Sequence, residues 1–281
     1  GSSNKSGNNS TPNTSDGRNI VAYANYDFVA GDKIIFEDDF RGDMDGEFPS
    51  HWNLISGQAI INQVGGHPAF LLTDGNYARV KPLIRSKDYL GNSFTIEYDT
   101  YLTEGAYGLI CMFHDSADDE LGHIYTNAES VDYSAVNSNG LSGSLAAAIQ
   151  YHNYYNKWHH IAIAYKNRQM KVYVDQYRPL VVPNVNFVPA TMQFAGIGDL
   201  NNPIIVKNVR IAQGGDMNML NSVMTTGRIV THNITFDINQ AVIKPESMGE
   251  INRIYKILNE NKDMKFEIQG HTDSDGDDAS N

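Results

Sequence analysis

The sequence predicts a mainly β protein, an antiparallel two-sheet sandwich followed by an incomplete α/β unit of the β-α-β type. Many short segments between residues 20 and 213 have strand character, and none shows helical periodicity. Gly (24) and Tyr (16) are frequent, which is typical of short strands joined by tight turns. After residue 214 the pattern changes to strand, amphipathic helix and strand.

The clearest strands alternate polar and apolar residues with a period of two. Residues 93–102 do so, and residues 158–165 pair with 169–175 as a hairpin across a turn at 166–168. Further strand candidates are 33–36, 58–62, 69–72, 78–84, 145–150, 192–196 and 204–212. So many short strands favour a two-sheet sandwich.

Composition excludes several classes of function. The formal net charge is -12, which argues against nucleic acid and anionic membrane surfaces as partners. No stretch approaches the ~20 apolar residues of a membrane-spanning helix. The single cysteine, Cys111, lies in an apolar run, so we expect a buried thiol that forms no internal disulfide or zinc site.

The chain divides into four parts. Residues 1–19 are rich in Ser, Asn, Thr and Gly and predict a flexible polar linker. Residues 20–213 form the sandwich, 214–228 a second linker, and 229–281 the α/β unit. The polar start resembles the tether of a bacterial lipoprotein, although an expression-tag remnant would also explain Gly1.

The α/β unit is predicted from a strand at 229–236, a helix and a strand at 264–268. Pro245 suits the first turn of the helix. The apolar face of the helix has 3.6-residue spacing and consists of Ile251, Ile254, Tyr255 and Leu258.

Three motifs occur in order here: Ile234-Thr235-Phe236-Asp237, Ala241-x-Ile243-x-Pro245-Glu246-Ser247 and Gly270-His271-Thr272-Asp273-Ser274-x-Gly276. Over residues 229–281 they resemble the OmpA C-terminal-like domain. The resemblance implies an envelope protein, associated with the outer membrane at its periplasmic face, that binds the diaminopimelate of peptidoglycan noncovalently. The residues that it implies as ligand contacts are Asp237, Asn239, Thr272 and Asp273.

Diaminopimelate carries an ammonium and a carboxylate on one carbon, so its site needs an anion and an Arg or backbone N–H groups. Asp273 would supply the anion, although a carboxylate that satisfies its own turn is the simpler alternative. In the family the Arg stands on a helix that would follow Asn281. We therefore expect this chain to bind diaminopimelate weakly or not at all, and the half-domain to be marginally stable alone.

The segment Gly46-Glu47-Phe48-Pro49-x-x-Trp52, the preceding strand and the Trp158 hairpin resemble a concanavalin A-like (laminin-G-like) jelly roll. That fold hosts glycosidases, lectins and interaction modules, so it does not give the function. Glu97-x-Asp99 begins a retaining-glycosidase motif, but Tyr101 and Leu102 occupy the positions of its third carboxylate. We therefore predict no enzyme, and a solvated polar face at Glu97 and Asp99.

Two further sites are candidates in the sandwich. Glu37, Asp39 and Asp199 would bind Ca²⁺ if the first and last strands meet, although an acidic triplet supplies only part of the six to eight oxygens required. Tyr151, Tyr154 and Tyr155 form an aromatic loop suited to a carbohydrate, or simply cover a turn. His159 and His160 alternate faces and should not chelate one ion.

We therefore expect a non-enzymatic envelope protein that anchors to peptidoglycan and carries an interaction sandwich. A carbohydrate-binding module on a wall anchor is the alternative, and a glycoside hydrolase is the third hypothesis.

Overall fold

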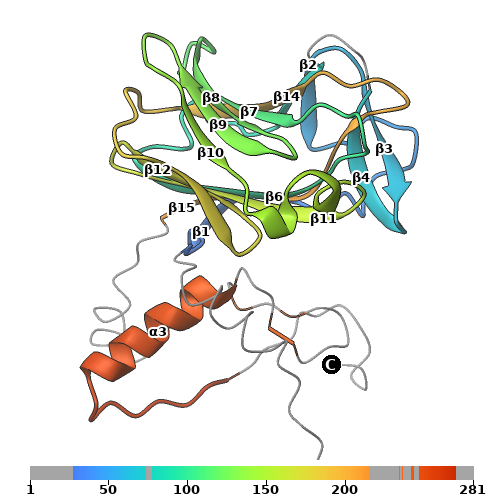
Figure 1. Ribbon diagram of the computed structural model, residues 1–281. Coiled ribbons are helices and arrows are strands. Elements are labelled where there is room, and N and C mark those ends of the chain that lie inside the picture. Colours follow the sequence, from blue (N-terminus) through green and yellow to red (C-terminus); the bar gives the residue numbers. More distant parts are fainter. Residues whose placement is uncertain are drawn as a thin grey trace, which may run out of the picture.

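The computed structural model describes residues 28–73, 78–214, 234, 236, 242–243 and 247–269. In this part of the chain an eight-stranded sheet and a seven-stranded sheet pack face to face (Figure 1). The pairings between the named strands are antiparallel in both sheets. The predicted mainly β, two-sheet antiparallel sandwich is thus confirmed, and the arrangement is consistent with a jelly roll.

Sheet A has the strand order β13-β12-β11-β6-β15-β4-β3, and β1 also pairs with β15. Its strands are β1 (Lys33–Asp38), β3 (Ala59–Val64), β4 (His67–Leu72), β6 (Ser93–Tyr101), β11 (Trp158–Lys166), β12 (Gln169–Val174), β13 (Tyr177–Val182) and β15 (Ile204–Gln213). Strands β6 and β15 lie at its centre, so their outward side chains have neighbours on both sides.

Sheet B has the order β10-β9-β8-β7-β14-β5-β2. Its strands are β2 (Trp52–Ser56), β5 (Ala78–Pro82), β7 (Leu109–His114), β8 (Glu120–Thr126), β9 (Ser130–Ala135), β10 (Leu141–Ser144) and β14 (Thr191–Gly196). Strands β7 and β14 are central in this sheet.

The core lies between the sheets and is rich in aromatic rings. Trp52 from β2 stacks on Phe194 of β14 at a ring-centroid distance of 5.8 Å, and it contacts Phe70 of β4 at 5.4 Å. Each large side chain that is fully buried contributes about 1.5–3 kcal/mol relative to exposure. Cys111 is completely buried in this layer, as predicted, and burial raises the pKa of its thiol well above the usual range.

The strand predicted at 145–150 is wrong. The chain there forms two short 3-10 helices, η1 (Ala147–Ile149) and η2 (Tyr151–Asn153). The reason is that β10 ends at Ser144 and the chain then crosses from sheet B to sheet A, so these residues have no cross-strand partner. Strands β2, β7 to β10 and β13 were not predicted; β7 lacks alternation because Ile110 and Met112 on its outer side are also apolar.

Helix α3 (Met248–Glu260) confirms the helix predicted after Pro245. The strand predicted at 264–268 is wrong, because these residues form no ladder, and Ile268 remains 83% exposed. In the C-terminal part that the structure describes, the β-pairing consists of one bridge, Phe236 to Ile243. The α/β unit is therefore not shown. No helix among the described residues has the length and apolarity needed to span a membrane.

Contact between edge strands β10 and β13 closes the sandwich on one side and depends on Gly143. A Cβ at Gly143 would lie 2.0 Å from the carbonyl oxygen of Pro179. Gly143→Ala should overpack this contact and lower the free energy of unfolding by about 1–3 kcal/mol. Urea titrations measure this change. The matched control is Gly42→Ala, which meets no atom within 4 Å; equal effects of the two substitutions would contradict this view of the edge.

Candidate functional site

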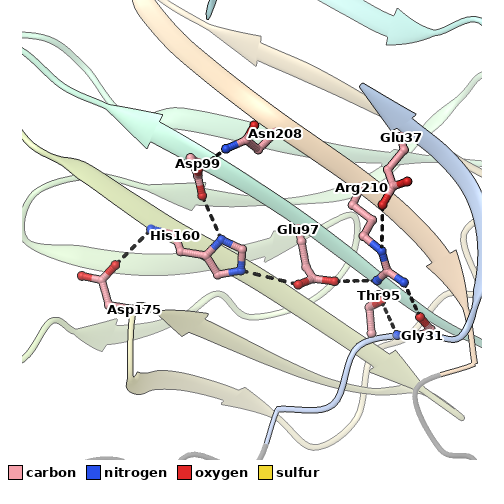
Figure 2. Close-up of polar contacts among 9 residues, drawn as sticks. All are labelled: Gly31, Glu37, Thr95, Glu97, Asp99, His160, Asp175, Asn208 and Arg210. Atoms are coloured by element: carbon pink, nitrogen blue, oxygen red, sulfur yellow. Dashed lines mark hydrogen bonds and ion pairs between the residues drawn. The ribbon is translucent and has the colours of Figure 1, made fainter. Parts of the chain in front are cut away.

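The apolar layer between the sheets leaves the two outer faces of the sandwich for polar chemistry. On sheet A the outer side chains of β6, β11 and β15 form a charge network, defined here as Glu37, Glu97, Asp99, His160, Asn208 and Arg210 (Figure 2). On sheet B the outer side chains of β5, β7, β8, β9 and β14 form rows across the strands. The two faces differ in how completely their polar groups are paired.

Arg210 is the centre of one half of the charge network. Its Nη1 donates to Glu97 Oε1 at 2.9 Å, and its Nε lies 3.3 Å from Glu37 Oε1. Its Nη2 donates to the backbone carbonyl of Gly31 at 2.7 Å, while the Gly31 N–H donates to Thr95 Oγ1 at 2.9 Å. The guanidinium thus ties β1, β6 and the segment before β1 to β15 (Figure 2).

His160 is the centre of the other half. Its Nδ1 lies 2.9 Å from Asp99 Oδ1, and its Nε2 lies 3.5 Å from Glu97 Oε2. Asn208 Nδ2 donates to the second oxygen of Asp99 at 2.7 Å. His159 points to the other side of the strand, where its ring contacts Asp175 at 2.8 Å and the Tyr154 carbonyl at 3.0 Å. The two histidines therefore share no ion, as predicted.

The protonation of this pair follows from its surroundings. Burial alone would lower the pKa of His160, but its hydrogen bond to Asp99 and the negative charges of Asp99 and Glu97 raise it well above its usual range. Burial likewise works against ionised Asp99, yet His160, Asn208 and Lys207 lower the pKa of that carboxyl. The structure therefore favours an imidazolium between two carboxylates.

The prediction of a solvated polar face at Glu97 and Asp99 is wrong. Glu97 is 8% exposed, and both carboxylates are bound by cations or amides from neighbouring strands. Sequence alternation places them on an outer face, but it does not reveal that β15 and β11 supply their partners. Both carboxylates therefore already have partners within the protein, Arg210 for Glu97 and His160 with Asn208 for Asp99.

The predicted calcium ligands do not converge. Glu37 pairs with Arg210, Asp39 with Arg41 at 3.2 Å, and Asp199 accepts the N–H groups of its own loop. Asp199 precedes β15, whereas Arg210 lies about 20 Å further along that strand at ~3.3 Å per residue. As a set these residues cannot bind one ion. Among the described residues no group of three His, Cys, Asp or Glu side chains could hold a metal.

Asp38, between the two predicted ligands, has a structural role. It accepts hydrogen bonds from Trp52 Nε1 and from the Phe40 N–H, both at 2.9 Å. Burial raises the pKa of this carboxyl, although both hydrogen bonds oppose the shift.

Only part of the predicted tyrosine loop is accessible. Tyr154 is fully buried and stacks on His159 at 3.9 Å between ring centroids, so its assignment to a carbohydrate is corrected. Tyr155 packs partly against the core. Tyr151 is 49% exposed and has a positive φ of 55°. The loop therefore offers one exposed ring instead of three, because η2 turns the other two inward.

Rows of polar side chains cross the outer face of sheet B in register. One complete row runs from β2 to β10 and contains Ser56, Arg79, Ala195, Ile110, Tyr125, Asp132 and Ser142. A second contains Asn53 and Lys81 on β2 and β5, and Gln193, Met112, His123 and Ser134 on β14 to β9. We call these residues the sheet B polar face; each row combines donors, acceptors and an aromatic or imidazole ring.

The turn between β7 and β8 reaches over this face. Asp118 Oδ2 pairs with Lys81 Nζ at 3.0 Å, and its Oδ1 accepts from Gln193 Nε2 at 3.3 Å. Burial by itself would raise the pKa of Asp118, but the hydrogen bond and charge of Lys81, with smaller contributions from His114 and Gln193, together lower it. No prediction from the sequence includes the polar face. The pattern of β8, where His123 and Tyr125 alternate with Ile124, is a signal that would have found part of it.

The residues predicted to bind peptidoglycan, Asp237, Asn239, Thr272 and Asp273, lie outside the described part of the chain. Their assignment stays a prediction.

No protein-family model matches the chain, and no curated protein shows significant sequence similarity to it. Solved structures with a similar arrangement include a sialidase, with 13% identity over 74% of this chain and 22% of that chain at a TM-score of 0.48. The carbohydrate-binding module CBM66 from Bacillus subtilis has 14% identity over 58% of this chain and 96% of that chain, at a TM-score of 0.42. Domain 4 of the arabinanase AbnA from Geobacillus stearothermophilus was solved in complex with arabinotriose. It has 15% identity over 66% of this chain and 94% of that chain, at a TM-score of 0.43.

This chain thus spans about a fifth of the sialidase. Similarity at this level carries no argument about ligand or activity, so both must come from the residues themselves.

His160→Gln tests the charge network. Removing one partner of a buried ion pair leaves the carboxylates uncompensated and should cost about 3–5 kcal/mol of unfolding free energy. Folding raises the pKa of His160. Its contribution to the free energy of unfolding is therefore complete below the ordinary pKa of 6.5, and it is lost as pH rises through the pKa of the folded protein. Wild type should therefore lose stability in urea titrations as pH rises above 6.5, and the variant should lose less. Equal slopes in the two proteins would refute the imidazolium assignment.

Proposed function

We propose that the sandwich is a non-enzymatic carbohydrate-binding module whose glycan lies across the sheet B polar face. The observation that carries this proposal is the register of the polar rows. A row that spans seven strands at ~4.8 Å spacing is about 29 Å long, a length that suits several linked sugar rings. Arg79, His123, Asp132 and Gln193 supply both donors and acceptors, as sugar hydroxyl groups require.

Apolar contact on this face comes from side chains between the polar ones. Tyr125 and Ile110 are adjacent in the first row, and Met112 and His123 in the second. A sugar ring has an apolar face as well as hydroxyl groups, so flat or soft side chains beside hydrogen-bonding groups suit it.

The outer face of sheet A is less suitable. Its charges are paired with each other, and Lys207 Nζ lies 4.1 Å from the ring centre of Trp158, which also contacts Tyr101. The segment at Phe28 packs on Tyr173 of β12, with Met248 of α3 beside them. A ligand there would have to displace contacts within the protein.

The absence of enzymatic activity is part of the proposal, and its support is the pairing of Glu97 and Asp99 with Arg210 and His160. Glu97→Gln should lower thermal stability, and neither it nor wild type should release reducing sugar from β-glucans. Hydrolysis by wild type that disappears in Glu97→Gln would overturn this part and favour a glycoside hydrolase.

Carbohydrate binding is tested with a glycan array followed by calorimetric titration of the strongest neutral oligosaccharide. Arg79→Ala and His123→Ala should each weaken binding at least tenfold, equivalent to about 1.4 kcal/mol, because each removes hydrogen-bonding groups from a row. Trp158→Phe, on the outer face of sheet A, is the control and should bind like wild type. Loss of binding in the control alone would move the site to sheet A.

A second proposal concerns residues 229–281, which we infer to be an OmpA-like segment for diaminopimelate at the periplasmic face of the outer membrane. Its support is the order of the three motifs together with helix α3 where the motif spacing requires it. Titration of isotope-labelled protein with diaminopimelate should give weak, saturable NMR shifts at Asp237, Asn239, Thr272 and Asp273. Saturable shifts that lie elsewhere in the chain, or that persist in the matched variant Asp273→Ala, would refute it.

A further inference from the structure

Three buried polar atoms without a hydrogen-bond partner lie together on the outer side of β7 and β14, at the margin of the sheet B polar face. They are Thr191 Oγ1, His114 Nδ1 and Gln193 Oε1. Thr191 and His114 face each other in the pairing of β14 with β7, and Gln193 is the next outward residue on β14. His114 is 2% exposed and Gln193 1% exposed.

These side chains point away from the core, because the residues between them belong to it. Phe113 on β7 and Met192 and Phe194 on β14 are in the core cluster. Buried polar groups are almost always paired. Three unpaired groups on one patch of an outer face therefore indicate that hydrogen bonds from outside the chain complete them.

The cover of this patch is easily moved. Asp118 lies over it from the β7–β8 turn, held by Lys81 and by the amide nitrogen of Gln193. Its side chain is 45% exposed, and ion pairs with that exposure are weak. A ligand can replace the carboxylate without disturbing either sheet.

The three side chains of the patch, those of Thr191, His114 and Gln193, are uncharged. Burial lowers the pKa of the His114 ring, more than the nearby Asp118 and Glu120 raise it, so the ring is neutral at pH 7. A hydroxyl donates and accepts, an amide oxygen accepts, and a neutral imidazole nitrogen does one or the other. Two carboxylates, Asp118 and Glu120, and two cations, Arg79 and Lys81, act on the His114 ring, and this balance of charge suits an uncharged ligand.

We propose that Thr191, His114 and Gln193 form a subsite for adjacent hydroxyl groups of a neutral sugar ring, with Asp118 as its displaceable cover. The proposal rests on the proposed carbohydrate-binding function and specifies the sugar class and the contacts. In this subsite the Thr191 hydroxyl has a partner only when ligand is bound. Removing the hydroxyl should therefore weaken ligand binding without lowering the stability of the free protein.

The test is Thr191→Val, an isosteric change, beside Thr100→Val as the matched control. Thr100 Oγ1 is buried and donates to the Ile205 carbonyl at 3.0 Å on the far sheet. Without glycan, Thr191→Val should keep or raise the melting temperature, whereas Thr100→Val should lower it. Calorimetry uses neutral tetrasaccharides of glucose, mannose, galactose and arabinose, and tetragalacturonate as the acidic probe. Thr191→Val should lose at least tenfold in affinity for the preferred neutral sugar, and Thr100→Val none.

Each contrary outcome has a separate meaning. A lower melting temperature in Thr191→Val would show that the hydroxyl has a partner within the protein and would overturn the subsite. If wild type binds a glycan and Thr191→Val binds it with unchanged affinity, the subsite alone would be overturned. Preference for tetragalacturonate would overturn the neutral-sugar assignment, and no binding of any glycan by wild type would overturn the proposed function as well.

Discussion

The apolar layer between the two sheets is the constraint on which the rest of the molecule depends. A strand turns successive side chains to opposite faces, so burying Phe94, Ile96 and Tyr98 of β6 forces Thr95, Glu97 and Asp99 outward. The same alternation in β14 buries Met192 and Phe194 and turns out Thr191 and Gln193. Both outer faces thus receive polar groups as a consequence of core formation, and each must satisfy them by its own means.

Sheet A pairs its charged groups with one another, and a β-bulge makes this possible. The register of β15 against β6 shifts between Lys207 and Arg210, and Asn208 has a φ of 51°. In a regular strand Lys207 and Arg210, three positions apart, would point to opposite faces. The bulge turns both outward with Asn208 beside them, so three donors from one strand face the carboxylates of β6. Because desolvation offsets much of the attraction in such pairs, the network locates β1 and the Gly31 segment more than it stabilises the fold.

Sheet B leaves part of its hydrogen-bonding capacity unused. Thr191, His114 and Gln193 each have a buried atom without a partner, whereas Asp132 in the adjoining row is bound by Ser130 and Ser142. On the outer face of sheet A one such atom, His160 Nε2, lacks a hydrogen bond, and it lies 3.5 Å from Glu97 Oε2. This contrast, more than any single residue, distinguishes the face proposed for binding from the face that holds the chain together.

The sequence alone predicted much of the fold and little of the site. Period-two alternation located β6 and β11, because one face of each is buried and the other polar, and the hairpin turn after β11 located β12. Alternation failed for β7, where both faces are apolar, and for 145–150, where an apolar run turns between sheets instead of pairing. The sequence also predicted helix α3 from its apolar spacing, but not the failure of 264–268 to form a strand, since pairing depends on a neighbour that spacing does not reveal.

What the sequence by itself determined is which residues face outward, because alternation is a local property of the backbone. It could not determine which outward residues meet. Glu97 and Arg210 are separated by 113 positions, and only the strand order and the bulge in β15 place them in contact. In the same way, only the pairing of β7 with β14 makes neighbours of His114 and Thr191. Register across the sheets is a tertiary property. It decided that Glu97 and Asp99 have partners within the protein and that three unpartnered polar atoms lie together on the opposite face.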